Sequence, residues 1–497
     1  MNDATSVVAP VAPRDERAAD GRREAPSPRR SQPTMRWPRS ASVRAVRTLA
    51  MVSMLVWAAC SGSKESAPAA VDRPVTTGPT PGPTPGPTTN PGLTGTTTPT
   101  STTPAKPAPP PVASGDDFAA QVRALYDLGA CGGDGPVDPR YAGKAHDRHC
   151  AAMQGRYDSY RKHWADRARE FIAALEPAGL PTTVVYPFGG GDLGSALVVF
   201  PEATEITTIS LEAAGDVRTI DGIPPATLRK DVDTIGHDIG RLYKAAHSTT
   251  KSLQSASHSR LPGTVLFALA AMAVNELEPL SLRYFDLGDD GAPNYLTGAE
   301  LDRRVAAATA AAEAAAPPRG KRATAKGSVD HFWHEQTSVF ANIEITFRAK
   351  GATAAAPRVY RHLVANLDDS HLEADARVLR HLEAKGKVAV MTKAASFLLW
   401  YDDFSTIRTY LLEHMAWMIS DASGIPPSYA GPAGFEQITY GEFVDAYFIK
   451  DPKNTRREFI ELWRKSPRRP LPFRFGYPDS EEHGHLMITR PRSRPRS

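Results

Sequence analysis

Apolar and polar residues follow two kinds of spacing from about residue 116 onward. Apolar positions at helical spacing predict helices at 117–130 and 145–179, and Gly179 followed by Pro181 ends the second. Apolar runs bounded by turn residues predict strands at 180–188 and 205–212, on either side of a short helix at 192–200. A helical region at 225–257 and a helix at 263–277 then precede a strand at 279–287.

The second half of the chain repeats the alternation. It predicts strands at 342–351, 357–367 and 387–400, helices at 373–386 and 405–421, and a last short strand at 436–443. Strands separated by helices of this length indicate the α/β class. We expect an open, doubly wound, Rossmann-type mixed sheet with helices on both faces, preceded by an α-helical N-terminal segment.

Composition divides the chain into five regions. We expect a leader with a signal peptide at 1–60, a disordered Pro/Thr/Gly-rich linker at 61–115 and a helical segment at 116–180. The α/β domain is expected at 181–450. The last region, 451–497, is rich in Pro and Arg, which predicts a loose tail.

The N-terminal region has the pattern of a bacterial export signal. Arginines precede the apolar run LAMVSMLVWAAC, which is too short to span a bilayer as a stable helix, and small residues come directly before Cys60. This ending resembles a lipoprotein lipobox, which implies cleavage before Cys60 and acylation of its thiol. We therefore predict a lipid-anchored protein of the bacterial cell envelope, facing the periplasm or the cell surface, with the membrane as its first partner.

Charge argues against a nucleic-acid partner. Residues 1–60 hold ten Arg and five acidic residues, so the net +4 of the whole chain leaves residues 61–497 at about −1. A nearly neutral body lacks the basic surface that phosphate-driven binding requires.

The cysteines suggest an oxidising compartment. Of the three in the chain, Cys131 and Cys150 remain if Cys60 is acylated, and outside the cytoplasm two such residues are expected to form a disulfide. Unpaired thiols are one alternative. A zinc site with His146 and His149 is another, although the spacing matches no common ligand pattern.

A glycine-rich turn follows the first predicted strand. Gly189, Gly190 and Gly191 precede Asp192, and Glu212 lies 23 residues after Gly189 at the end of the next strand. Glycines let a backbone approach a ligand, and an acid at the next strand tip can accept from ribose hydroxyls. The unit resembles the first βαβ of class I S-adenosylmethionine-dependent methyltransferases, which implies their fold. An exported protein is separated from the cytoplasmic methyl donor, so we expect the fold without this activity and without a bound cofactor.

Further blocks of sequence resemble an uncharacterised family of bacterial envelope proteins between about residues 180 and 429. They include VVYPFGGGD, VYRHLVANLDD and the block around the SGIP sequence at 423–426. The resemblance implies a fold and a location but no reaction. It marks the following positions: Tyr186, Pro187, Phe188, Gly190, Asp192, Glu212, Asp368, Lys393, Ser396, Ser405, Arg408, Asp421, Ser423, Gly424 and Pro426.

Two cations complete the candidate site. Lys393 follows an apolar strand and Arg408 lies in a predicted helix, so either could pair with Asp192, Glu212 or Asp421 across the end of the sheet. Such pairs could be a structural ion-pair network or could line a pocket for a small polar ligand. The segment DHFWHE, with His331, His334 and Glu335, resembles a metal motif only superficially, and we expect no metal.

These features predict a non-catalytic module that binds a ligand or a protein partner at the envelope. The alternative is an envelope hydrolase or transferase with its active site around Asp192 and Glu212.

Overall fold

The computed structural model describes residues 115–135, 137–245, 260–315, 339–393, 395–443, 455–476 and 484–492. The chain divides into the units Met1–Pro104 and Ala105–Ser497, and all described residues belong to the second. Cys60, the predicted leader, nearly all of the predicted linker and the DHFWHE segment lie outside the described residues. Within the described part, no helix has the length and apolar character needed to cross a bilayer.

A ten-stranded mixed sheet forms the centre of the domain, in the order β4-β3-β5-β6-β2-β1-β7-β8-β10-β9. The strands are β1 (Thr183–Pro187), β2 (Glu205–Ser210), β3 (Leu277–Leu287), β4 (Pro293–Tyr295), β5 (Ile343–Ala349), β6 (Arg358–Val364), β7 (Val388–Thr392), β8 (Met415–Ser420), β9 (Phe435–Gly441) and β10 (His485–Pro491). The predicted α/β class is therefore confirmed.

The five central strands are parallel and run in the order β6-β2-β1-β7-β8. On one side β10 is antiparallel to both β8 and β9, and on the other side β5, β3 and β4 continue the sheet in antiparallel pairs. The chain leaves β1 toward β2 and β6, then returns to β7 on the opposite side of β1. The sheet is thus doubly wound and mixed, as predicted, with a topological switch point between β1 and β7.

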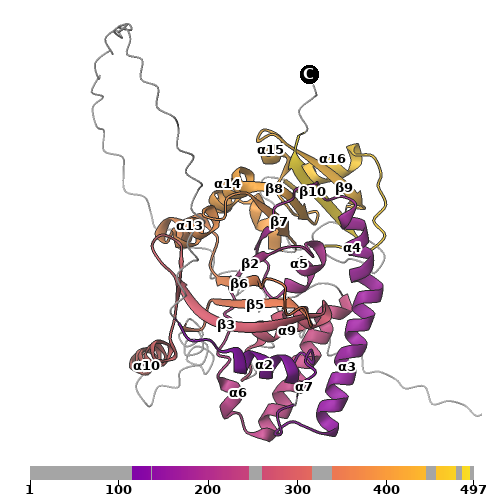
Figure 1. Cartoon of the computed structure of the whole chain (residues 1–497). Coiled ribbons are helices and arrows are strands. Elements are labelled where there is room, and N and C mark those ends of the chain that lie inside the picture. The colour runs from indigo at the N-terminus through magenta and orange to yellow at the C-terminus, as the bar shows by residue number, and fades with distance from the viewer. Residues whose placement is uncertain are drawn as a thin grey trace, which may run out of the picture. The chain divides into compact units, whose positions relative to one another are not determined.

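Helices cover both faces of this sheet (Figure 1). They are α2 (Ala119–Leu128), α3 (Lys144–Tyr160), α4 (Asp166–Ala173), α5 (Leu193–Val199), α6 (Thr219–Gly222), α7 (Pro225–Ala245), α9 (Gly263–Val274), α10 (Gly298–Ala315), α12 (Asp369–Ala374), α13 (Arg377–Glu383), α14 (Ser405–His414), α15 (Pro427–Ala430) and α16 (Thr455–Lys465). The larger core lies under the face covered by α2 to α9, and the second core lies under α12 to α15.

The helices before β1 pack into the larger core. A π-helical turn, η1 (Arg161–Ala165), joins α3 to α4, and the aromatic side chains of Tyr160 and Trp164 are buried beside it. Cys131 and Cys150 form the predicted disulfide, which ties the start of this region to α3. Their sulfurs are thus bonded to each other, and Nε2 of His149 contacts the carbonyl oxygen of Gly129 at 3.0 Å. In this disulfide-bonded form the two cysteines are not free to be zinc ligands.

Two boundaries differ from the prediction. The apolar segment Met415–Ser420 is strand β8, although the sequence predicts that the helix starting at 405 continues to 421. Its side chains are nearly all buried because neighbouring strands and helices cover both faces, and such a segment has no alternating pattern that separates it from a buried helix. The predicted strand at 387–400 ends at Thr392, and two short 3₁₀ turns follow it, η2 (Ala395–Trp400) and η3 (Asp402–Phe404).

The C-terminal region is not a loose tail throughout. Helix α16 packs its Phe459 against Trp400, and β10 fills the position between β8 and β9. The α/β domain therefore extends to Pro491 instead of ending near 450. The inserted strand satisfies the backbone groups of β8, which would otherwise be an edge strand.

Candidate functional site

The glycine-rich turn connects β1 to α5 at the carboxyl edge of the parallel strands. Phe188 and Gly190 have positive φ angles of 62° and 50°, and a Cβ at Gly189 would lie 2.9 Å from the carbonyl oxygen of Tyr186. Gly189, Gly190 and Gly191 are all buried. Asp192 is the N-cap of α5 and accepts a hydrogen bond from the Ser195 backbone amide at 3.4 Å. The sequence requires glycine here because the turn packs tightly against Tyr186.

A buried ion pair joins this turn to the end of β7. The Lys393 ammonium lies 3.0 Å from Oδ2 of Asp192 and donates a second hydrogen bond to Oγ of Ser195, also at 3.0 Å. Ser195 Oγ in turn donates to Asp192 Oδ1 at 2.7 Å, and the hydroxyl of Tyr186 donates to Oδ2 at 3.0 Å. Asp192 is 5% exposed and Lys393 is 3% exposed. The predicted pairing of Lys393 with Asp192 is thus present.

Aromatic side chains cover the pair. The Lys393 nitrogen is 5.9 Å from the ring centroids of both Trp164 and Phe475, which come from η1 and from the segment before β10. The Trp164 indole N–H donates to the Arg474 carbonyl oxygen at 2.6 Å, which connects the N-terminal helices to the C-terminal segment. Burial, reinforced by the Asp192 carboxylate, raises the pKa of Tyr186 well above its ordinary value. The pair therefore lies in a closed environment.

A second polar group lies at the ends of β7 and β8. Oδ1 of Asp421 accepts hydrogen bonds from the Ser396 hydroxyl at 3.1 Å, from the Ser423 backbone amide at 3.0 Å and from the Ser423 hydroxyl. The Trp400 indole donates to the carbonyl oxygens of Ser423 and Gly424 at 3.0 and 3.2 Å. This group fixes the turn after β8, and its side chains are buried.

Arg408 and Glu212 do not join the Asp192–Lys393 pair. Nη1 of Arg408 donates to the carbonyl oxygens of Leu399 and Tyr401 at 2.7 and 2.9 Å, and its guanidinium lies 3.9 Å from the centroid of the Tyr429 ring. It therefore holds the turns before α14. Among the described residues, the Glu212 carboxylate has no hydrogen bond or ion pair, although its backbone carbonyl contacts Nε2 of His362 at 2.7 Å. Burial lowers the pKa of this histidine.

Other positions marked by the family resemblance hold helix ends. Asp368 is the N-cap of α12 and accepts from the His371 backbone amide at 3.0 Å. Burial alone would raise the pKa of Asp368, but its hydrogen bonds with His371 and Ser370 outweigh this effect and lower the pKa to about 2. Ser405 begins α14 and donates its hydroxyl to the Asp369 carboxylate at 2.6 Å. These contacts explain the residue types at both positions through helix capping.

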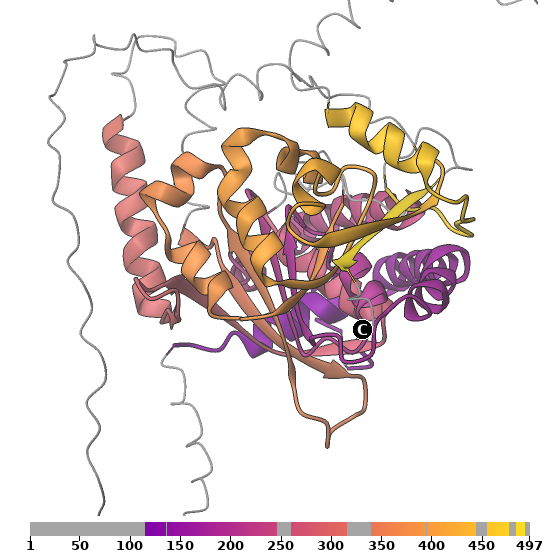
Figure 2. The same ribbon diagram turned by 90° about the horizontal axis from the view of Figure 1, so that it is seen from above.

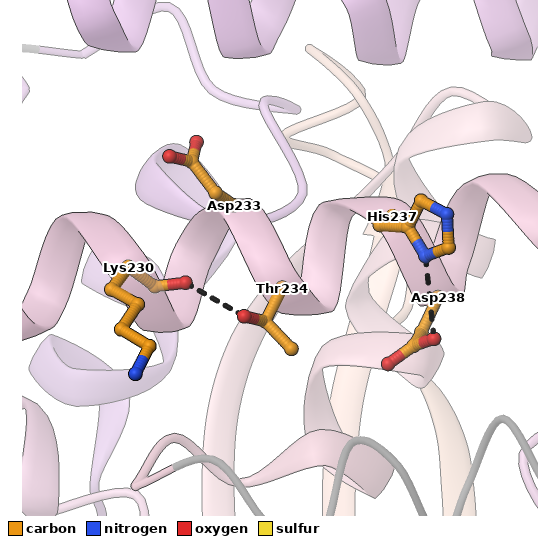
Figure 3. Close-up of a pocket in the computed structure, with 5 residues that line it drawn as sticks. All are labelled: Lys230, Asp233, Thr234, His237 and Asp238. Atoms are coloured by element: carbon orange, nitrogen blue, oxygen red, sulfur yellow. Dashed lines mark hydrogen bonds and ion pairs between the residues drawn. The ribbon is translucent and has the colours of Figure 1, made fainter.

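An open hollow lies elsewhere, on α7 (Figure 3). It has a volume of about 600 Å³ and is lined by Lys230, Asp233, Thr234, His237 and Asp238. Figure 3 shows Lys230 and Asp233 pointing in different directions, while Nδ1 of His237 lies 3.7 Å from Oδ1 of Asp238, so the four side chains do not converge on one point. The hollow contains none of the residues predicted from the sequence.

Sequence reasoning missed the aromatic cover and the role of Ser195. Trp164 and Phe475 are 311 positions apart, and no local pattern relates them. The contact of Ser195 with Asp192 could have been predicted, because a hydroxyl three residues after a capping aspartate lies within reach of its carboxylate.

Comparisons of the chain with protein families, curated proteins and solved structures found no match.

Proposed function

We propose that this chain is an exported, lipid-anchored envelope protein whose methyltransferase-like domain binds a partner without catalysing a reaction. The observation behind this proposal is the buried Asp192–Lys393 ion pair at the switch point of the sheet. In doubly wound sheets, ligands bind in the crevice outside the strand ends at this point.

The ion pair takes the position that a cofactor needs. A phosphate or carboxylate of a ligand would be held by backbone amides at the start of α5. Here the Asp192 carboxylate accepts from the Ser195 amide instead, and Lys393 neutralises it from β7. With Ser195 only 2% exposed and two aromatic rings above Lys393, a substrate cannot reach these groups without a rearrangement.

The disulfide supports the proposed location. Disulfides persist in exported proteins and are rare in the cytoplasm, and Cys131–Cys150 is one. The apolar run ending at Cys60 and the Pro/Thr/Gly-rich segment after it fit a lipid anchor followed by a tether. A partner is then met through the outer surface of the domain, since the crevice is filled by the protein's own side chains.

The filled crevice predicts the outcome of a ligand screen. The melting temperature of the full chain is expected to stay unchanged with S-adenosylmethionine, S-adenosylhomocysteine, nucleotides or divalent metals, because only a ligand that binds the native state raises it. The measurement is thermal unfolding followed by intrinsic fluorescence. A rise of several degrees with one of these compounds would contradict the proposal and favour an envelope enzyme.

The anchor predicts a labelling result. Cells that express the full chain and are grown with a radioactive fatty acid should incorporate label into the wild-type protein and not into Cys60→Ser. Cys131→Ser serves as the matched control. It should retain the label, because Cys60 is intact and the Cys131 sulfur of the wild type is bonded to Cys150. An unlabelled wild-type chain would show that the lipobox interpretation is wrong.

A further inference from the structure

Helix α16 is fixed to the domain by one face only. Phe459 is fully buried and stacks on Trp400 with ring centroids 5.0 Å apart, while Leu462 and Trp463 pack against the same small cluster. Figure 1 and Figure 2 both show α16 at the outside of the domain. The opposite face of the helix is therefore available at the surface.

The outer face combines cations with one apolar side chain. Arg457, Ile460, Glu461, Arg464 and Lys465 recur at intervals of three or four residues, which places them on one side of the helix. Ile460 is 40% exposed and, with Leu211, is one of two large hydrophobic side chains exposed among the described residues. Glu461 is the single acid on this face and lies within 3.3 Å of Arg457 and 3.0 Å of Lys465.

The positive charge continues past the end of the helix. From 463 to 475 the sequence contains five cations and no acid. The Arg469 carbonyl oxygen accepts from the Gly441 amide at 2.8 Å, which attaches the segment to the end of β9, and exposed Pro467 and Pro470 flank Arg468 and Arg469. We call Arg457, Arg464, Lys465, Arg468 and Arg469 the basic strip.

Most of this charge is not neutralised by the domain. In the part of the chain that the structure describes, no carboxylate lies within ion-pair distance of Arg464 or Arg468. The neighbouring Glu458 is turned away, since its carboxylate accepts from the backbone amide and the hydroxyl of Ser428 at 2.8 and 3.1 Å. The strip is thus a local positive surface on a domain that is nearly neutral.

We propose that the basic strip, together with the exposed side chain of Ile460, docks the domain on an anionic lipid surface. Cations arranged around an exposed apolar side chain on an amphipathic helix match the boundary between phosphate headgroups and acyl chains. Nucleic-acid binding fits less well, because it would use exposed aromatic rings, and Phe459 and Phe473 are buried.

This contact adds something that the proposed anchor lacks. A tether with the composition of residues 61–115 would keep an anchored domain near the membrane without fixing its orientation. Docking through α16 would turn a defined side of the domain toward the bilayer. The interaction does not require acylation of Cys60, so it can be tested separately from the anchor.

The test uses residues 60–497 with Cys60→Ser, the chain left after the predicted cleavage and without its acylation site, in vesicle flotation. We expect it to float with phosphatidylglycerol–phosphatidylcholine vesicles and much less with pure phosphatidylcholine, and binding should fall as salt is raised. The triple variant Arg464→Gln, Lys465→Gln, Arg468→Gln should lose roughly 100-fold in partition coefficient, at about five-fold per cation. The Arg-rich leader is absent from all variants, so flotation reports binding by the rest of the chain.

Matched variants separate this effect from general charge and from misfolding. Arg148→Gln, Lys162→Gln, Arg167→Gln removes three exposed cations from α3, η1 and α4 and should leave flotation unchanged. Ile460→Ser, which alters no charge, should weaken binding while preserving its salt dependence. Three results would overturn the proposal. The first is equal flotation with both vesicle types, and the second is an equal loss in the two triple variants. The third is tighter binding to a single-stranded RNA than to the anionic vesicles.

Discussion

Replacing Lys393 with methionine is expected to lower the free energy of unfolding by about 3–5 kcal/mol, because it leaves the buried Asp192 carboxylate without its cation. Tyr186 and Ser195 would still donate to this carboxylate, but they are neutral. Methionine is close to lysine in length, so the loss arises from charge more than from volume. Urea unfolding followed by fluorescence measures the difference, and Lys162→Met, on the exposed side of η1, should change it by less than about 0.5 kcal/mol.

The double variant Asp192→Asn, Lys393→Met tests the mechanism. Asparagine remains a good N-cap for α5, and the uncompensated charge is gone, so the double variant should be more stable than Lys393→Met alone. A double variant that is less stable by the sum of the two single losses would show that the pair does not act as a unit. A Lys393→Met protein as stable as the Lys162→Met control would show that the crevice is not closed by this ion pair.

The stability of the pair bears on function because the same residues fill the ligand crevice. An active site of this fold would need the turn after β1 to approach a ligand, whereas Asp192 here bonds to four groups of the protein itself. Opening the crevice for a ligand would break these contacts and cost their net free energy, which the double variant measures against the wild type. A ligand would have to supply this free energy before it gained any affinity.

The sequence predicted the parts of this domain that depend on local pattern. The strand–turn–helix unit around the glycines, the disulfide and the contact between Asp192 and Lys393 were all among its expectations. The first two depend on short-range spacing or on the scarcity of cysteines. The third was one of several possible pairings, and it depends on the fact that β1 and β7 are neighbours, which places both strand ends at one edge.

The remaining features depend on contacts between distant segments. Arg408 was expected at the strand ends, but its helix directs it to the carbonyl oxygens of Leu399 and Tyr401. The predicted loose tail contains β10, whose backbone groups pair with β8 and β9 in a way that composition does not reveal. The cover over Lys393 joins Trp164 to a segment more than 300 residues later. Neither periodicity nor spacing encodes such a pairing.

Truncating Trp164 to alanine should be as costly as breaking the ion pair, at about 3–5 kcal/mol. The indole is buried, lies 5.2 Å from the Tyr160 ring, and forms an edge contact with Phe473 at 6.3 Å. Its loss would leave a cavity beside Lys393 and remove the hydrogen bond to the Arg474 carbonyl oxygen. Urea unfolding measures the loss, and Trp164→Phe, which retains most of the ring, should lose less than half as much.

Indole added to Trp164→Ala should restore part of the stability, because an apolar cavity of matching shape binds a small aromatic molecule and only the native state contains it. The melting temperature of the variant should rise with indole concentration, while the wild-type protein, whose cavity is filled by its own side chain, should not respond. Without this rescue, the loss would reflect a collapse of η1 onto the sheet. With it, the cover over Lys393 is a preformed aromatic site that Trp164 occupies, and the crevice of this fold is closed by the chain's own residues.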